Sequence, residues 1–419
     1  MGTPEAGRHR RAPEQRSSYA EVFAVREFRW LRAAQVLSFA GDQFAQVAIA
    51  ILVFRRTGSA FLTALAYALT YLPPIAGGPL LSGLADLFPR RRVMIACDLI
   101  RVLTVGLMAV RGMPFWALCA LLFCTVLISA PFSSARSALI PDVLSPDQLP
   151  VGSAIGNITH QTSQIVGFVT GAAVVAAVGS YRTLGIDALT FGISAFILFT
   201  AVRARPAVER TPGKRPTVWS VSADGIRLVF SDRVLRTLLL FGWLAGFYIL
   251  PEGLAAPYAH SVGGTAVTIG LLMAAVPLGT VLGGVLLQRF AAPSAQVRVM
   301  GWLAIASCAP LAASVWNPPL PVVLLLWLAA GMGGAFQLAA APAFVTALKP
   351  GMRARAFGVA QSGLCAIQGL GILAGGATAQ AIGAPMAVSL AGLLGLCAAT
   401  GLAMSWTQLQ GKLITGQRP

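Results

Sequence analysis

The sequence predicts an all-α integral membrane protein with about twelve transmembrane helices in two six-helix repeats. Hydrophobic residues make up 56% and charged residues only 11% of the 419 positions. So few charges cannot solvate a globular surface of this size. Long apolar runs recur along the chain, and basic residues gather in every second gap between them. A lipid bilayer is therefore expected around most of the chain.

Each apolar run is long enough to cross the hydrocarbon core of a bilayer. The runs cover residues 31–54, 59–85, 93–110, 113–139, 151–178, 183–202, 236–261, 266–287, 297–316, 320–348, 357–382 and 386–409. They divide the chain into an N-terminal segment, two bundles, a polar linker and a tail: 1–30, 31–203, 204–235, 236–409 and 410–419. The first run exceeds the hydrophobic region of a signal peptide, so we expect an uncleaved anchor.

The basic residues predict the orientation of these helices. All but five of the 31 Lys and Arg residues lie in or beside alternate gaps, whereas Arg55, Arg56, Arg111 and Arg182 lie in the others and Arg101 lies inside a run. Lys and Arg near span ends stay on the cytoplasmic side. Both termini are thus expected in the cytoplasm of a multi-pass cell-membrane protein. Orientation and anionic headgroups account for the net charge of +17, so no nucleic-acid partner is expected.

An internal repeat relates the two bundles. A shift of 204 residues superimposes Pro73 on Pro277 and Gln164 on Gln368, and it also matches several glycines, among them Gly179 with Gly383. Parallel six-helix halves are typical of secondary transporters, whose substrate site lies between the halves near the midplane.

Other functional classes lack their sequence signatures. Neither Gly213-Lys214 nor Gly411-Lys412 completes a phosphate-binding loop, and the six cysteines have no metal-like spacing. We expect no cofactor, no metal and no catalytic residue. An intramembrane enzyme would need a nucleophile with its base or a metal cluster, and a receptor would normally carry a sizeable soluble domain. These two classes remain the alternatives to a transporter.

One loop resembles the signature of the major facilitator superfamily. The second run ends in Ser82-Gly83-Leu84-Ala85-Asp86-Leu87-Phe88-Pro89-Arg90-Arg91-Arg92, with Asp86 and Arg90 at the signature's acidic and basic positions. Ser82, Leu87 and Pro89 depart from it.

The first half also resembles the macrolide-efflux and enterobactin-exporter branch of that superfamily. The matching segments are Phe28-Arg29-Trp30-Leu31, Ser38 with Gly41-Asp42, Thr57-Gly58-Ser59, Asp98-Leu99-Ile100-Arg101 and Ile186-Asp187-Ala188-Leu189-Thr190-Phe191. The resemblance implies the major facilitator fold, export, and a cytoplasmic gating network of Asp86, Arg90, Asp98, Arg101 and Arg136. Phe168 replaces the proline that efflux members often carry in the fifth span, which puts strict antiport in question.

Carboxylates inside apolar runs are the main candidates for proton coupling, since an ionisable group in hydrocarbon normally faces a cavity or a partner. Asp42 lies about 15 Å along the first run at ~1.5 Å per residue. Gln35, Ser38 and Gln46 share its helical face, which predicts one polar stripe. Asp42 is either a proton acceptor or a structural lock between helices. Glu252, which follows Pro251 and shares a face with Tyr248, has either a substrate or proton role or a simple position near the outer water.

The remaining polar residues have weaker functional expectations. Asp187 is expected at headgroup level, Asp98 and Arg101 as a structural ion pair, and His160 in helix packing. The residues expected to line the substrate cavity are Gln35, Ser38, Gln46, Gln164, Tyr248, Phe336 and Gln368.

These features predict a monomeric secondary transporter that exports a small hydrophobic or amphipathic, drug-like compound by alternating access and proton antiport, a multidrug-efflux type of activity. Sodium coupling stays open, because a carboxylate with backbone carbonyls also binds a hard cation. The alternatives are export of a siderophore or other secondary metabolite, and transport of a lysophospholipid.

Overall fold

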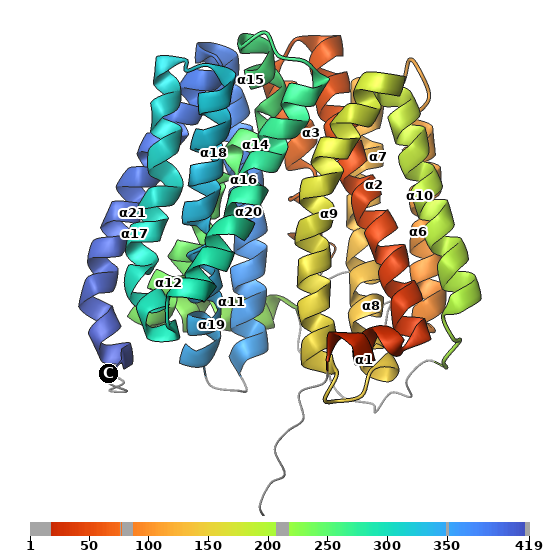
Figure 1. Ribbon diagram of the computed structural model, residues 1–419, viewed down its shortest axis with the longest axis horizontal. Helices are drawn as coiled ribbons and strands as arrows, with labels where there is room; N and C mark the ends of the chain where they lie inside the picture. The colour runs from red at the N-terminus through yellow and green to blue at the C-terminus, as the bar shows by residue number, and fades with distance from the viewer. Residues whose placement is uncertain (1–17, 76, 78–86, 207–217, 349–351, 415–419) are drawn as a thin grey trace, which may run out of the picture.

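The computed structural model describes residues 18–75, 77, 87–206, 218–348 and 352–414, and all regular structure in these ranges is helical. Figure 1 shows two groups of helices side by side, with the chain's N-terminal half on the right and its C-terminal half on the left. Within the described ranges, ten helical segments are long and apolar enough to cross a membrane. This confirms the predicted all-α membrane fold.

The first half contains the helices before residue 206. They are α1 (Tyr19–Ala24), α2 (Arg26–Thr57), α3 (Ala60–Ala68), α6 (Arg90–Met108), α7 (Phe115–Leu127), α8 (Ser129–Val143), α9 (Leu149–Val178) and α10 (Ser180–Ala201). α7 and α8 follow one another as one span, Phe115–Val143. The charged helix α6 is not among the ten apolar segments, because it carries Arg90, Arg91, Arg92, Asp98 and Arg101.

The second half begins inside the predicted linker. Its helices are α11 (Val218–Ser231), α12 (Arg233–Trp243), α13 (Ala245–Tyr248), α14 (Leu250–Gly253), α15 (Ala255–Ser261), α16 (Ala266–Phe290), α17 (Pro293–Ala312), the 3-10 turn η1 (Ala313–Trp316), α18 (Leu320–Gly334), α19 (Gln337–Ala347), α20 (Arg353–Ile382) and α21 (Ala384–Ile414). α11 packs against α20, where a Cβ added to Gly225 would lie 2.9 Å from Val359. The predicted linker therefore contains a packed helix, while residues 207–217 lie outside the described ranges.

The proposed repeat agrees with the helix boundaries. α9 and α20 are both 30 residues long, and a shift of 204 residues carries one onto the other. Each ends at a glycine with positive φ, Gly179 at 85° and Gly383 at 89°. Only glycine adopts this conformation without strain, so a glycine terminates both helices in the same way.

Contacts between the halves gather at one end, which the charge rule predicts to be the outer end. Here α3 packs on α20, and α9 on α16. A Cβ added to Gly376 would lie 2.3 Å from that of Ala64, and the side chain of Ser59 donates a hydrogen bond to Gln380 (2.9 Å). The rings of Phe54 and His260 also meet across the halves at 5.4 Å. Small residues thus let the helices approach closely, as is typical in membranes.

Candidate functional site

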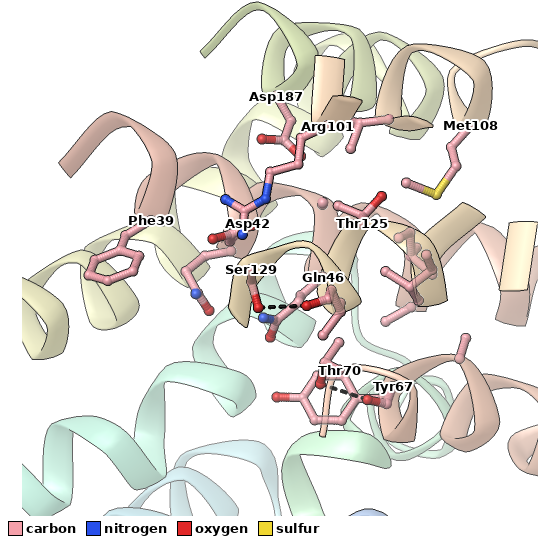
Figure 2. A pocket seen from close by; sticks show the side chains of 18 of the residues that line it. Phe39, Asp42, Gln46, Tyr67, Thr70, Arg101, Met108, Thr125, Ser129 and Asp187 are labelled. Atoms are coloured by element: carbon pink, nitrogen blue, oxygen red, sulfur yellow. Dashed lines mark hydrogen bonds between the residues drawn. The ribbon is translucent and has the colours of Figure 1, made fainter. Parts of the chain in front are cut away.

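A polar cavity of about 200 Å³ lies inside the first half. Its polar wall comes from α2, α6, α9 and α10 and includes Asp42, Gln43, Gln46, Arg101, His160 and Asp187, several of which Figure 2 shows converging. A site between the halves was predicted, but this cavity is lined by first-half residues. The reason is local: Ala45, Ala50 and Ala66 occupy its wall, and their small side chains leave space within the bundle.

The predicted polar stripe of α2 faces the bundle interior. Asp42 and Gln46 line the cavity, and Ser38 accepts a hydrogen bond from Arg101 (3.3 Å). Gln35 accepts one from Arg32, at a buried position one turn earlier. The polar face of this long helix is therefore shielded from lipid.

Asp187 lies in the cavity wall and not at headgroup level, which corrects the prediction. Its side chain is 1% exposed and accepts a hydrogen bond from Thr190 (3.3 Å). The carboxylate fits because α10 crosses α2 at Gly41: a Cβ there would lie 2.1 Å from Asp187 Oδ1. The glycine was visible in the sequence, but which helix it faces was not.

Arg101 is buried between two phenylalanine rings. Its guanidinium carbon lies 5.2 Å from the ring centre of Phe132 and 5.1 Å from that of Phe191, a geometry that favours a cation over an aromatic face. The predicted ion pair with Asp98 is not formed. Asp98 instead accepts a hydrogen bond from Ser194 (2.7 Å), so α6 presents the two charges to different neighbours.

Three buried polar atoms of the cavity wall have no hydrogen-bond partner: Asp187 Oδ2, Gln43 Oε1 and Arg101 Nε. Buried polar atoms are normally paired with protein or water. Two acceptors and one donor thus lie unpaired among the residues that line the cavity. Gln43 was not among the predicted site residues, although it follows Asp42 directly.

Glu252 is buried at the contact between the halves. It lies on α14, where Pro251 helps to divide the predicted seventh span into α12 to α15. Its carboxylate, 2% exposed, accepts a hydrogen bond from the hydroxyl of Tyr67 in the first half (2.9 Å). Tyr67 also lines the cavity, although no feature of the sequence singled it out.

The other predicted cavity residues lie elsewhere. Tyr248 accepts a hydrogen bond from Gln337 (3.0 Å), and Phe336 packs at 0% exposure against Tyr248 and Phe241. Gln368 is 7% exposed and Gln164 half-buried, and no hydrogen bond joins these two described side chains. His160 does line the cavity, with its ring edge-on to Phe39 at 4.9 Å.

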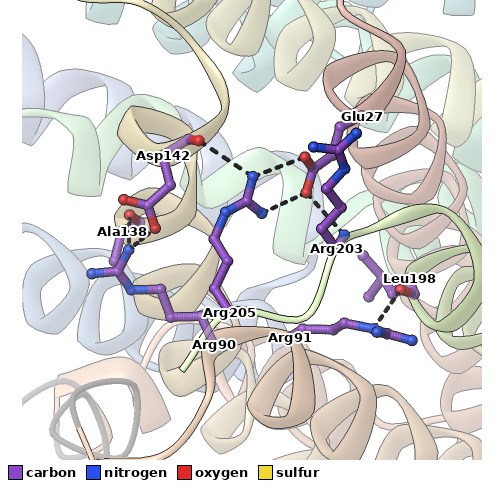
Figure 3. A network of polar contacts seen from close by, with 8 residues as sticks. All are labelled: Glu27, Arg90, Arg91, Ala138, Asp142, Leu198, Arg203 and Arg205. Atoms are coloured by element: carbon purple, nitrogen blue, oxygen red, sulfur yellow. Dashed lines mark hydrogen bonds and ion pairs between the residues drawn. The ribbon is translucent and has the colours of Figure 1, made fainter. Parts of the chain in front are cut away.

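A charge network joins the predicted cytoplasmic ends of the first half (Figure 3). Arg90 forms an ion pair with Asp142 and donates to the carbonyl of Ala138 (2.7 Å). Glu27 accepts two hydrogen bonds from Arg205, at 2.6 and 2.9 Å. These bonds raise the pKa of Arg205. The segment that follows α10 is thus held against α2 by Glu27. Arg205 also donates a hydrogen bond to the backbone carbonyl of Asp142 (3.3 Å).

The four predicted gating residues that the structure describes do not form one network. Arg90 belongs to the network of Figure 3, whereas Asp98 and Arg101 lie deeper, and Asp86 lies outside the described residues. Arg136 stacks on Phe39 at 5.3 Å. The partners of Arg90 are Asp142 and a backbone carbonyl of α8, which the sequence comparison with the superfamily loop did not indicate.

Two helical halves that close at one end beside a polar intramembrane cavity define a polytopic membrane transporter. Residues 33–254 match the Major Facilitator Superfamily, and the chain belongs to this family. Membership of this family indicates a transporter and not an enzyme. The resemblance identified in the sequence is confirmed.

Several relatives are named as efflux proteins. Macrolide efflux protein A of Streptococcus pyogenes is 26% identical over 271 residues, which are 63% of this chain and 66% of that protein, so the chain spans just under two thirds of its length. Multidrug efflux pump Tap of Mycobacterium tuberculosis is 27% identical over 373 residues, 84% and 86% of the two chains.

Solved structures share the fold. A bacterial homologue of the lysosomal transporter Spinster, inward-facing and occupied, superimposes with a TM-score of 0.71 at 16% identity over 96% of this chain and 99% of that one. A bacterial homologue of ferroportin in its inward-facing state gives 0.69 at 14% identity over 94% and 100%.

Proposed function

We propose that this transporter exports a small hydrophobic or amphipathic compound by alternating access, driven by protons moving inward. The observation that carries the proposal is the cavity with two carboxylates, Asp42 and Asp187, on the neighbouring helices α2 and α10 beside Arg101. The names of the efflux relatives support the direction of transport.

Proton coupling is supported by the environment of the carboxylates. No ion pair within 4.0 Å involves Asp42, Asp187 or Glu252 among the described residues. A carboxylate in a membrane interior is costly when charged and unpaired. Each can therefore exchange a proton as its access to water changes. Of the two predicted coupling residues we propose Asp42, because it lines the cavity beside Arg101, whereas Glu252 does not.

The proposal places the protein in the cell membrane as a monomer, with both termini in the cytoplasm. The asymmetry of Arg and Lys supports this orientation. The exported compound contacts Phe39, Tyr67 and Met108 through apolar surface and the amides of Gln43 and Gln46 through hydrogen bonds. Apolar surface with a few amides suits small amphipathic compounds.

Flux measurements in liposomes test the proposal. Purified protein is reconstituted with erythromycin as the probe, chosen from the macrolide class named for the relative, and a panel of other drug-like compounds. A pH gradient should drive accumulation, and collapsing the gradient should stop it. Replacing the pH gradient by a sodium gradient separates the two couplings. If no compound in a panel selected by cell susceptibility moves under either gradient, export coupled to these ions is refuted.

A further inference from the structure

Tyr67 is shared by two features that are otherwise separate. One side belongs to the wall of the first-half cavity, together with Ala66 and Thr70 of the same segment. Its hydroxyl, however, donates to the carboxylate of Glu252 in the second half (2.9 Å). Figure 2 shows the ring of Tyr67 at the lower edge of the cavity, away from Asp187 and Arg101.

This hydrogen bond is buried in the closed end of the molecule. Tyr67 is 3% and Glu252 2% exposed. The surroundings are packed tightly: a Cβ added to Gly253 would lie 3.3 Å from the Tyr67 ring and 2.5 Å from Ile372 of α20. No cation within 4.0 Å pairs with Glu252 in the described parts of the chain. The hydroxyl of Tyr67 is thus the group that satisfies this carboxyl across the halves.

We propose that the Tyr67–Glu252 hydrogen bond is a latch that holds the outer ends of the two halves together, and that Tyr67 places this latch in the cavity wall. Opening the outer end separates α3 from α14 and must break the bond. Breaking the bond leaves the Tyr67 hydroxyl and the Glu252 carboxylate without a partner until water reaches them. This costs free energy, so the bond favours the closed state. Because the Tyr67 ring contacts the cavity, a compound that moves this ring also strains the latch. This link between a compound in the cavity and the latch rests on the proposed function, export by alternating access.

Tyr67 both forms a bond across the halves and lines the cavity. Two other residues have only one of these properties each and identify the controls. The Ser59–Gln380 bond also crosses the halves, but it is solvent-exposed and its residues do not line the cavity. Thr70 lines the cavity, but its hydroxyl bonds the backbone of Tyr67 and does not cross the halves. Gln380→Ala and Thr70→Val therefore each remove one feature without the other, whereas Ser59→Ala would also remove the N-cap of α3.

The test measures the outer-end distance in lipid nanodiscs without any substrate. Spin labels on Arg111→Cys and Ser261→Cys, both exposed near the outer ends of opposite halves, report the ratio of open to closed molecules in a chain whose native cysteines are replaced. Tyr67→Phe and Glu252→Leu should each raise this ratio about tenfold, as expected for loss of a buried hydrogen bond to a carboxylate. Glu252→Gln keeps an acceptor for Tyr67 and should change the ratio by less than about threefold.

The double variant Tyr67→Phe/Glu252→Leu distinguishes a shared bond from two separate effects. Its ratio should equal that of either single variant within a factor of about two, because one bond is lost in all three. Gln380→Ala and Thr70→Val should match the unsubstituted chain. An unchanged ratio in Tyr67→Phe, or a product of the two single effects in the double variant, overturns the latch. Because no transport is measured, this result stands apart from success or failure of the flux experiment.

Discussion

Gly41→Ala tests whether the crossing of α2 and α10 positions Asp187 in the cavity. The added Cβ would lie 2.1 Å from Asp187 Oδ1 and 2.3 Å from Thr190 Oγ1, whereas real Cβ contacts almost never fall below 3.0 Å. The carboxylate must therefore withdraw by at least 0.9 Å, the difference between 3.0 and 2.1 Å. Overpacking of this kind costs about 1–3 kcal/mol. The helix preference of alanine over glycine offsets up to about 1 kcal/mol.

Gly185→Ala is the matched control for this substitution. Gly185 lies on α10, the helix that carries Asp187, but nothing lies within 4 Å of its added Cβ. Reversible unfolding in mixed micelles should show Gly41→Ala less stable than Gly185→Ala by about 1–3 kcal/mol. Adding Asp187→Ala to Gly41→Ala should recover part of this loss, because the clashing carboxylate is gone. Equal stability of the two glycine variants would refute the reasoning.

Three further predictions concern transport and the network at the helix ends. Asp42→Asn should leave folding intact, because the amide keeps the shape, but it should abolish flux driven by a pH gradient; unchanged dependence on that gradient would remove Asp42 from the coupling. Arg90→Ala should lower stability by no more than about 1 kcal/mol, because its ion pair with Asp142 is partly exposed at 22% and 38%. It should nevertheless slow transport at saturating substrate more than it changes substrate affinity; an altered binding constant with an unchanged turnover rate would contradict this. Glu27→Gln should free the segment that carries Arg203 and Arg205, seen as faster proteolysis after α10. Protection equal to that of the unsubstituted chain would show that backbone packing alone holds the segment.

Much of the fold could be predicted from the sequence, because a bilayer imposes strong one-dimensional rules. The thickness of the bilayer sets the length of the apolar runs. Backbone N–H and C=O groups in lipid must be hydrogen-bonded within helices. The glycines Gly179 and Gly383 predicted the repeat, and both end helices of equal length. The polar stripe of α2 followed from helical spacing alone, and its burial follows from the cost of polar groups in lipid.

The tertiary structure decided which helices meet, and that determined the site. Asp187 enters the cavity because Gly41 stands opposite it, a contact between residues separated by most of the first half. Asp98 accepts a hydrogen bond from Ser194 and forms no ion pair with Arg101, although Arg101 is only three residues away in the sequence. The reason is that α10 places the Ser194 hydroxyl within hydrogen-bond distance. Tyr67 gains its role from Glu252, 185 residues away. Helical periodicity shows which face of one helix is polar, but the partner of that face depends on packing between helices, which no local pattern encodes.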